Sequence, residues 1–161
     1  DPTLANGEYL FVVKHLPVNR FDIVVASEKD EDGKTKQIVK RVIGLPGDTI
    51  RYENDQLYIN GKKTNEPYLK NYIARFKEDK LQSTYSYNSY FQSLADKAKS
   101  FTQDANGNTN FTIEVPKGEY LLLGDDRLVS KDSRQVGTFK ASQLQGEAKF
   151  RFWPLNRIGT F

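Results

Sequence analysis

Apolar and polar residues alternate with a period of two along most of the chain, which is the pattern of β-strands. Strands are expected over the segments 9–13, 23–26, 37–43, 49–52, 57–59, 111–115, 120–123 and 146–153. Turn residues separate several of them, above all Asn60-Gly61 and the polar segment 29–36. Many short strands with few helices favour a mostly β, antiparallel fold, either a folded-over sheet or a partly open barrel.

The segment 63–110 breaks this pattern, because it is polar and rich in Tyr, Ser, Asn and Lys. Within it, one apolar stripe recurs at helical spacing and consists of Phe91, Leu94, Ala95, Ala98 and Phe101. Ser89 followed by Gln92 fits a capping box at the start of that helix. We therefore predict one β domain over 1–161, with an inserted subdomain at about 63–110 that carries one amphipathic helix.

The composition excludes several kinds of catalytic site. The chain has 161 residues, which suits one domain, and it contains no cysteine, so disulfides, thiolate metal sites and thiol nucleophiles are excluded. The only histidine is His15, so a metal site with several histidines is impossible, and a Ser-His-Asp hydrolase would have to use His15. We expect no metal and no other cofactor, and an enzyme would have to use Lys, Asp or Glu as its base.

Charge and hydropathy limit the partners. The net charge is +3 and the two signs are interspersed, so the dense basic stripe of a nucleic-acid-binding protein is missing and no nucleic acid is expected as a partner. The sequence has neither an apolar run of about 18 residues nor the hydrophobic region of a signal peptide. Because it contains no Met, we expect a fragment or a processed form, with any membrane anchor before Asp1.

Lys40 is the first candidate for chemistry. On the strand 37–43 it shares a face with Ile38 and Val42, and two apolar neighbours would partly desolvate its amine. Desolvation lowers the pKa of a lysine, and a neutral lysine can act as a general base. The alternative is a lysine near a sheet edge that reaches water and discourages aggregation.

The polar segment 124–134 is the second candidate, since it directly follows the apolar strand 120–123. Polar residues at a strand end often form a buried hydrogen-bond network. In this one, Asp132 could pair with Arg134, and the Ser130 hydroxyl could orient a nearby amine. The alternative is an acidic surface loop with ordinary turn chemistry.

Four segments together resemble the conserved boxes of the type I signal peptidases, which are membrane serine–lysine proteases. Residues 40–48 resemble the KRVxGxPGD box and residues 124–134 the GDNxxxSxDSR box. Residues 1–4 resemble the tail of the SMxPTL box, and residues 22–25 resemble the GDIVV strand. The matches follow the order of the family and cover the whole chain. With streptococcal enzymes the resemblance includes the long insertion.

The resemblance implies a role for each matching residue. Lys40 would be the general base that activates a serine hydroxyl and later protonates the leaving amine. Ser130 would orient Lys40, whereas the residues that hold the site together would be Asp125, Asp132, Arg134 and, as a structural residue, Arg41. The nucleophilic serine of the SMxPTL box would lie two residues before Asp1. We therefore expect the chain as printed to have no peptidase activity.

The same resemblance indicates the substrate, which would be the signal peptide of an exported preprotein with small residues at −1 and −3. Shallow apolar pockets would exclude larger residues, and by position Leu4, Ile38 and Val39 should line them. The alternative for these three residues is ordinary core packing. The peptide would bind in an extended form beside the strand 37–40, by β-augmentation.

Two positions depart from the family pattern. Asp126 replaces an Asn and adds a possible charge, and Phe21 replaces the Gly before the second strand, which suggests a changed local turn. Near the C-terminus, Phe150 and Phe152 alternate toward one face, which favours core packing, whereas Trp153 is a candidate contact with the membrane surface. The family works at the cell membrane, with its catalytic domain on the extracytoplasmic side of a Gram-positive-type bacterium.

Three other functions stay open at this point. A relative without the full catalytic pair could be a non-catalytic module that binds peptides during surface-protein assembly, although such a module has no need of Lys40. A serine–lysine peptidase could also act on a soluble target, such as a self-cleaving repressor. A nucleic-acid-binding barrel would require an affinity that falls steeply with salt.

Overall fold

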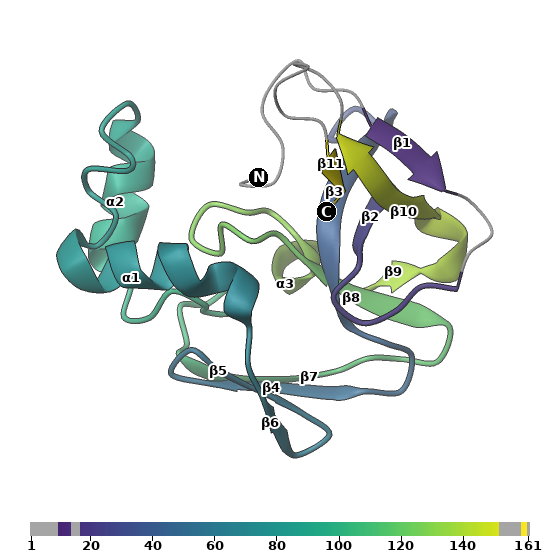
Figure 1. Cartoon of the computed structure of the whole chain (residues 1–161), viewed down its shortest axis with the longest axis horizontal. Coiled ribbons are helices and arrows are strands. Elements are labelled where there is room, and N and C mark those ends of the chain that lie inside the picture. Colours follow the sequence, from purple (N-terminus) through teal and green to yellow (C-terminus); the bar gives the residue numbers. More distant parts are fainter. Residues whose placement is uncertain (1–9, 14–16, 152–158, 161) are drawn as a thin grey trace.

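In the computed structural model, the described residues are 10–13, 17–151 and 159–160, and side chains are described for 17–146. Strands dominate this part of the chain, and every strand pairing in it is antiparallel. The mostly β, antiparallel fold is thereby confirmed. Two sheets carry the strands, and two helices lie to one side of them (Figure 1).

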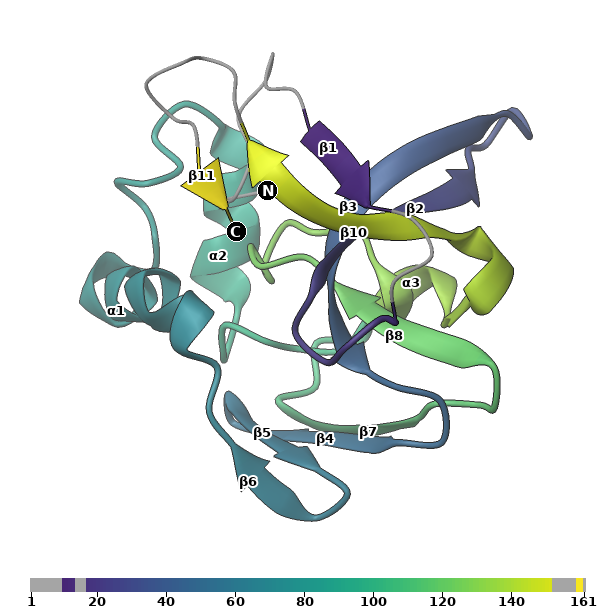
Figure 2. The ribbon, with the colours of Figure 1, turned by 45° about the vertical axis from the view of Figure 1, so that its right-hand side comes forward.

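The larger sheet has seven strands in the order β1-β10-β2-β3-β8-β9, with β11 also paired to β10. Its strands are β1 (Leu10–Val13), β2 (Ile23–Lys29), β3 (Thr35–Gly44), β8 (Glu119–Leu123), β9 (Phe139–Lys140), β10 (Leu144–Arg151) and β11 (Gly159–Thr160). β2 and β3 form a long hairpin that extends away from the two helices (Figure 2). Only the last part of β3, from Arg41 to Gly44, also pairs with β8.

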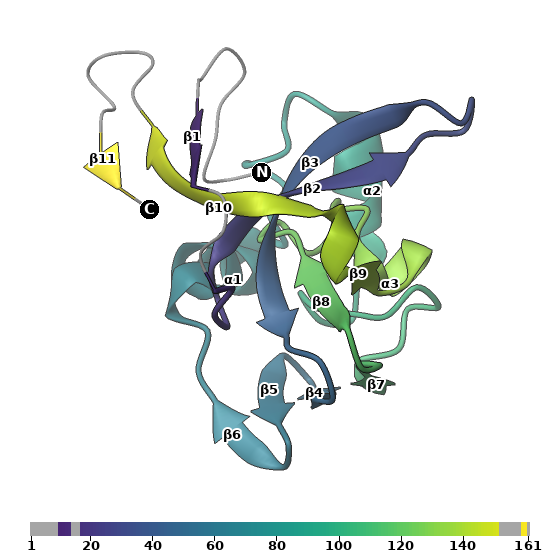
Figure 3. The same cartoon turned by 90° about the vertical axis from the view of Figure 1, so that its right-hand side faces the viewer.

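The smaller sheet lies below the larger one in Figure 3 and has the order β6-β5-β4-β7. Its strands are β4 (Thr49–Glu53), β5 (Gln56–Ile59), β6 (Lys62–Thr64) and β7 (Asn110–Glu114). One core joins the two sheets, and its buried residues are Ile43, Ile50, Tyr52, Leu57, Ile59, Val115, Leu121 and Leu123. Gly44 marks the junction, because a Cβ there would lie 2.7 Å from Cγ2 of Val115.

The segment between β6 and β7 contains two helices rather than the single one expected, namely α1 (Lys70–Asp79), preceded by a short 3-10 turn (Pro67–Leu69), and α2 (Ser89–Lys97). The expected capping box at Ser89 is wrong, since Asn88 is the N-cap and its side chain accepts a hydrogen bond from the Phe91 amide. These helices enclose a separate core, whose buried residues are Leu69, Leu81, Tyr85, Ala95 and Phe101. The exact bounds of the insertion, 63–110, stay a proposal.

Two further short helices follow β8 and flank β9. They are α3 (Ser133–Val136) and a 3-10 turn (Ala141–Gln143). α3 begins at a capping box. The Asp132 side chain accepts a hydrogen bond from the Arg134 amide over 3.1 Å, and the Gln135 side chain accepts one from the Asp132 amide over 2.9 Å. The carboxylate of Asp132 is therefore fixed at the end of the polar segment 124–134.

Several sequence-based expectations concern residues outside the described part of the chain. They include the proposed pocket residue Leu4, the histidine His15 and the membrane candidate Trp153. No helix in the described part is long and apolar enough to cross a membrane.

Candidate active site

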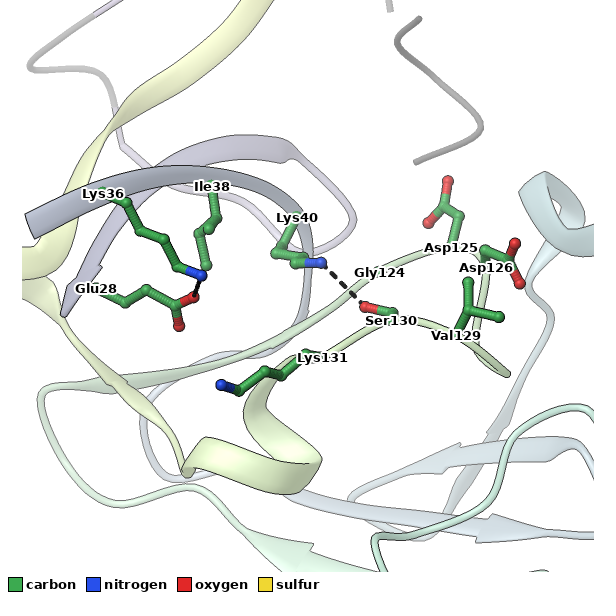
Figure 4. A pocket seen from close by; sticks show the side chains of 10 residues that line it. All are labelled: Glu28, Lys36, Ile38, Lys40, Gly124, Asp125, Asp126, Val129, Ser130 and Lys131. Atoms are coloured by element: carbon green, nitrogen blue, oxygen red, sulfur yellow. Dashed lines mark hydrogen bonds and ion pairs between the residues drawn. The ribbon is translucent and has the colours of Figure 1, made fainter. Parts of the chain in front are cut away.

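Lys40 and Ser130 come together although they are 90 residues apart in the sequence. The Lys40 Nζ donates a hydrogen bond of 3.0 Å to Ser130 Oγ. Figure 4 shows the two side chains pointing toward each other, one from β3 and the other from the loop after β8. The structure therefore joins the two segments that sequence analysis singled out.

The proton of the Ser130 hydroxyl has a different partner. Ser130 Oγ donates to Asp132 Oδ2 over 2.8 Å. Because a hydroxyl has only one proton, Ser130 can only accept a hydrogen bond from Lys40. A neutral Lys40 amine that donates one N–H to Ser130 keeps its lone pair free to accept a proton.

Asp132 is a fully buried carboxylate that organises this side of the site. Arg134 donates to both of its oxygens, each over 2.9 Å, and the Gly124 amide donates to Oδ2 over the same distance. Burial alone would raise the pKa of Asp132, but the hydrogen bonds and charge of Arg134, together with the Gly124 and Ser130 hydrogen bonds, more than offset it and lower that pKa. Asp132 is thus an ionised acceptor and a poor base for Ser130.

The amine of Lys40 is shifted toward its neutral form. Desolvation by burial lowers the pKa of Lys40 below its usual value, and the negative charge of Asp132 opposes this shift without cancelling it. Arg134, which is positively charged, lowers the same pKa further. A partly dry amine of this kind is suited to accept a proton from a hydroxyl near neutral pH.

Gly124 allows the two side chains to approach. A Cβ at position 124 would lie 2.1 Å from Ser130 Oγ, 2.6 Å from Ser130 Cβ and 3.3 Å from Lys40 Nζ. All three separations are at or below van der Waals contact, and the shortest two are far below it. The absence of a side chain at position 124 is therefore a condition for the Lys40–Ser130 hydrogen bond.

Arg41 and Asp125 form a bidentate ion pair on the opposite face of β3. The Arg41 Nε and Nη2 atoms donate to the two carboxylate oxygens of Asp125 over 2.9 and 2.8 Å. The guanidinium carbon lies 4.0 Å from the centre of the Tyr68 ring, and Nη1 donates to the Phe21 carbonyl. The pair ties β3 to the start of the loop that carries Ser130.

A cavity of about 260 Å³ opens beside the Lys40–Ser130 pair (Figure 4). It is lined by Glu28, Lys36, Ile38, Lys40, Gly124, Asp125, Asp126, Val129, Ser130 and Lys131. Ile38 is thus placed at the cavity, while it also packs against the core of the larger sheet. Val39 lies on the other face of β3, half-buried against Ile23 and Val25.

The two departures from the expected pattern have structural explanations. Asp126 is buried, and its Oδ1 accepts a hydrogen bond from the Tyr85 hydroxyl of the insertion. Burial raises the pKa of Asp126, and the Tyr85 hydrogen bond opposes that shift. Phe21 has a backbone φ of 73°, in the left-handed region that favours glycine, so this position has a conformation that a glycine would adopt with less strain. The Phe21 ring packs instead against Tyr68.

Sequence analysis missed Arg127, which joins three parts of the molecule. Arg127 is 2% exposed. Its guanidinium donates to the Gly124 carbonyl over 2.8 Å, to the Tyr52 hydroxyl over 2.9 Å and to Glu66 over 2.7 Å. Charged residues are rarely buried unless they are paired, so Arg127 in a polar loop resembles a surface residue until its partners are known. Its only signal is its position in the segment 124–134.

Comparison with known proteins gives a family match and two curated relatives. The model of the family "Signal peptidase, peptidase S26" matches residues 1–153. A signal peptidase I of Streptococcus pneumoniae strain R6 is 70% identical over 168 residues, which cover 100% of this chain and 81% of the relative. The signal peptidase I of Bacillus caldolyticus is 40% identical, and the match covers 98% of this chain and 76% of that protein.

A solved structure is similar as well. A crystal structure of a signal peptidase I from Enterococcus faecalis matches with a TM-score of 0.55 at 30% sequence identity. The match covers 82% of this chain and 97% of the other.

Proposed function

Because this chain belongs to the signal peptidase family, peptidase S26, and is therefore of the serine peptidase class, we propose that it removes signal peptides by a serine–lysine mechanism. Lys40 is the general base and Ser130 orients it. The nucleophile is a serine two positions before Asp1, as the likeness of residues 1–4 to the SMxPTL box implies. The hydrogen bond from Lys40 Nζ to Ser130 Oγ is the observation that carries this proposal.

The mechanism follows from the proton positions. The neutral amine of Lys40 takes the proton of the serine hydroxyl as that oxygen attacks the scissile carbonyl carbon, and it then donates the proton to the leaving amine. Ser130 and Asp132 hold the amine in place through the hydrogen-bond series Lys40–Ser130–Asp132. In deacylation, Lys40 takes a proton from the water that attacks the acyl carbon. It then donates that proton to the serine oxygen as the ester bond breaks.

The substrate would bind in an extended form along β3. Among the described residues, the edge of β3 from Gln37 to Lys40 that faces away from β2 has no strand partner, so it is open to β-augmentation. Leu4, Ile38 and Val39 would line the shallow pockets for the small residues at −1 and −3. Because Ile38 and Val39 lie on opposite faces of β3, they would meet different residues of the peptide.

The place of action would be the membrane surface. Signal peptides emerge from the membrane on its extracytoplasmic side, and an enzyme that cuts them has to work there. Trp153 remains the proposed contact with that surface, since Trp is favoured at the membrane–water interface.

The function is tested by adding Ser-Met before Asp1, which gives the chain with the proposed nucleophile, hereafter the extended chain. We expect the extended chain to cleave a preprotein after its A-x-A motif and the chain as printed to leave it intact. A preprotein with a bulky residue at −1 is the control and should be cut much more slowly. If the extended chain binds the signal peptide without cutting it, the proposal is wrong and the non-catalytic binding module is correct.

The pH dependence of cleavage should report the charges around Lys40. Activity needs the neutral amine, so kcat/KM should rise as the pH rises through the lowered pKa of Lys40. The carboxylate of Glu28 raises that pKa and the cation of Lys36 lowers it. Glu28→Gln should therefore shift the acidic limb of the profile to lower pH, and Lys36→Gln should shift it to higher pH.

The paired design supplies its own control. Glu28 and Lys36 lie opposite each other on β2 and β3, with 3.4 Å between their charged atoms. The double variant should return close to the original profile, and both single shifts should shrink at high salt. Single shifts in the same direction would contradict the assignment of the limb to Lys40.

A further inference from the structure

The turn from Asp126 to Ser130 holds the orienting hydroxyl of the site. The Asp126 carbonyl accepts hydrogen bonds from the Val129 amide over 3.2 Å and from the Ser130 amide over 2.9 Å. The backbone of Ser130 is therefore attached directly to that of Asp126. A displacement of Asp126 would move Ser130 and lengthen its hydrogen bond to Lys40.

The insertion binds this turn through side chains. The Tyr85 hydroxyl donates to the carboxylate of Asp126. Arg127 donates to Glu66 over 2.7 Å and to Thr102 over 3.2 Å, and both acceptors belong to the insertion.

The insertion also supplies apolar contacts and one contact beyond the turn. Leu128 and Val129 pack against the buried core of the insertion. Further along, Arg134 donates to the Gln103 carbonyl over 2.9 Å. Every residue of the turn before Ser130 thus contacts the insertion.

We propose that the insertion positions the Ser130 turn for catalysis, and that Tyr85 is the positioning residue whose hydroxyl transmits this constraint through Asp126. The inference rests on the proposed function, in which Ser130 orients Lys40. Tyr85 touches neither the substrate nor the reacting atoms, and it acts through the turn alone.

The Tyr85–Asp126 contact is suited to this task because both groups are buried. Tyr85 is 1% exposed and Asp126 is 9% exposed. A buried carboxylate that loses one of its hydrogen-bond donors is disfavoured, and it would turn toward water. Such a movement would displace the carbonyl that holds the Ser130 amide.

Tyr85→Phe in the extended chain is the test, since it removes the hydroxyl and keeps the ring in its core. We expect kcat to fall by about tenfold with KM little changed, since small displacements of orienting groups reduce the rate of the chemical step. Tyr87→Phe is the matched control, because Tyr87 is in the same insertion but 75% exposed, and it should leave kcat unchanged.

Variants of Asp126 separate positioning from general stability. Asp126→Asn keeps an acceptor oxygen for Tyr85 and should retain most of kcat. Asp126→Ala should match Tyr85→Phe, and the double variant should be no slower than either single variant, because both remove the same contact. If Tyr85→Phe fails to fold, the comparison of Asp126→Asn with Asp126→Ala still decides the question.

The proposal is overturned if Tyr85→Phe or Asp126→Ala lowers the unfolding temperature but leaves kcat intact in the folded protein. It is also overturned if the two changes multiply in the double variant. Lys40→Ala, assayed in parallel, distinguishes a failure of the proposed function from a failure of the positioning role of the insertion. If Lys40→Ala retains activity, the proposed function fails, whereas a dead Lys40→Ala beside a fully active Tyr85→Phe rejects only the role of the insertion.

Discussion

Replacing Lys40 by Ala in the extended chain is expected to reduce kcat/KM for a preprotein by roughly 10⁴-fold or more, because the reaction then lacks its base. Lys40 is the amine whose pKa is lowered by burial and which lies 3.0 Å from Ser130. The measurement is the initial rate of preprotein cleavage, followed by gel or mass spectrometry.

Two controls make this result specific. Lys40→Met keeps most of the aliphatic stem and should be equally inactive while its unfolding temperature stays close to that of the parent. Ser130→Ala should lose only about 10- to 100-fold, since it removes orientation and not the proton acceptor. Equal losses for Ser130→Ala and Lys40→Ala would contradict the division of roles, and residual turnover in both lysine variants would exclude Lys40 as the base.

Replacing Gly124 by Ala is expected to be nearly as damaging, although Gly124 has no chemistry of its own. The added methyl group would lie 2.1 Å from Ser130 Oγ, so the Ser130 turn has to move away from β3. We expect kcat to fall by about 10²-fold or more and the free energy of unfolding to drop by about 1–3 kcal/mol. Steady-state kinetics and thermal unfolding of the same sample measure both effects.

Gly44→Ala is the matched control for this prediction. It also places a Cβ too close to a neighbour, 2.7 Å from Val115, but at the junction of the two sheets rather than at the site. It should destabilise the protein while the folded fraction keeps its kcat. If Gly124→Ala behaves in the same way as Gly44→Ala, the close approach at Gly124 matters only for packing.

The longer strands could be predicted because each carries its own signal, whereas β6, β9 and β11 were missed because two or three residues are too few to show a period. The period of two around Ile38, Lys40 and Val42 places these residues on one face of a strand, and β3 (Thr35–Gly44) contains the whole expected strand 37–43. α1 was missed because its apolar residues, Tyr72, Ile73 and Phe76, are few, and none of its residues is buried. The helix is stabilised by the contacts of these three residues with the core of the insertion, which the sequence of α1 alone does not show.

The site was predictable in part. From the residue pattern alone, Lys40 could equally have been a lysine near a sheet edge, and the segment 124–134 could have been a surface loop. Only the resemblance to the family placed the two in one site. Arg127 and Asp126 could not be interpreted in advance, because their burial depends on Glu66 and Tyr85, which are 61 and 41 residues away in the sequence. Local periodicity carries no information on such distant partners.

The wide separation of Lys40 and Ser130 along the chain determines when, during folding, the Lys40 amine becomes desolvated. The segment between Lys40 and Ser130, which are 90 positions apart, includes the whole insertion, so the amine stays hydrated until that segment and the turn after it have docked. A hydrated lysine has an ordinary pKa and stays protonated at neutral pH. Under the proposed mechanism, a partly folded chain would therefore lack its base, and peptidase activity would arise only with the completed tertiary structure.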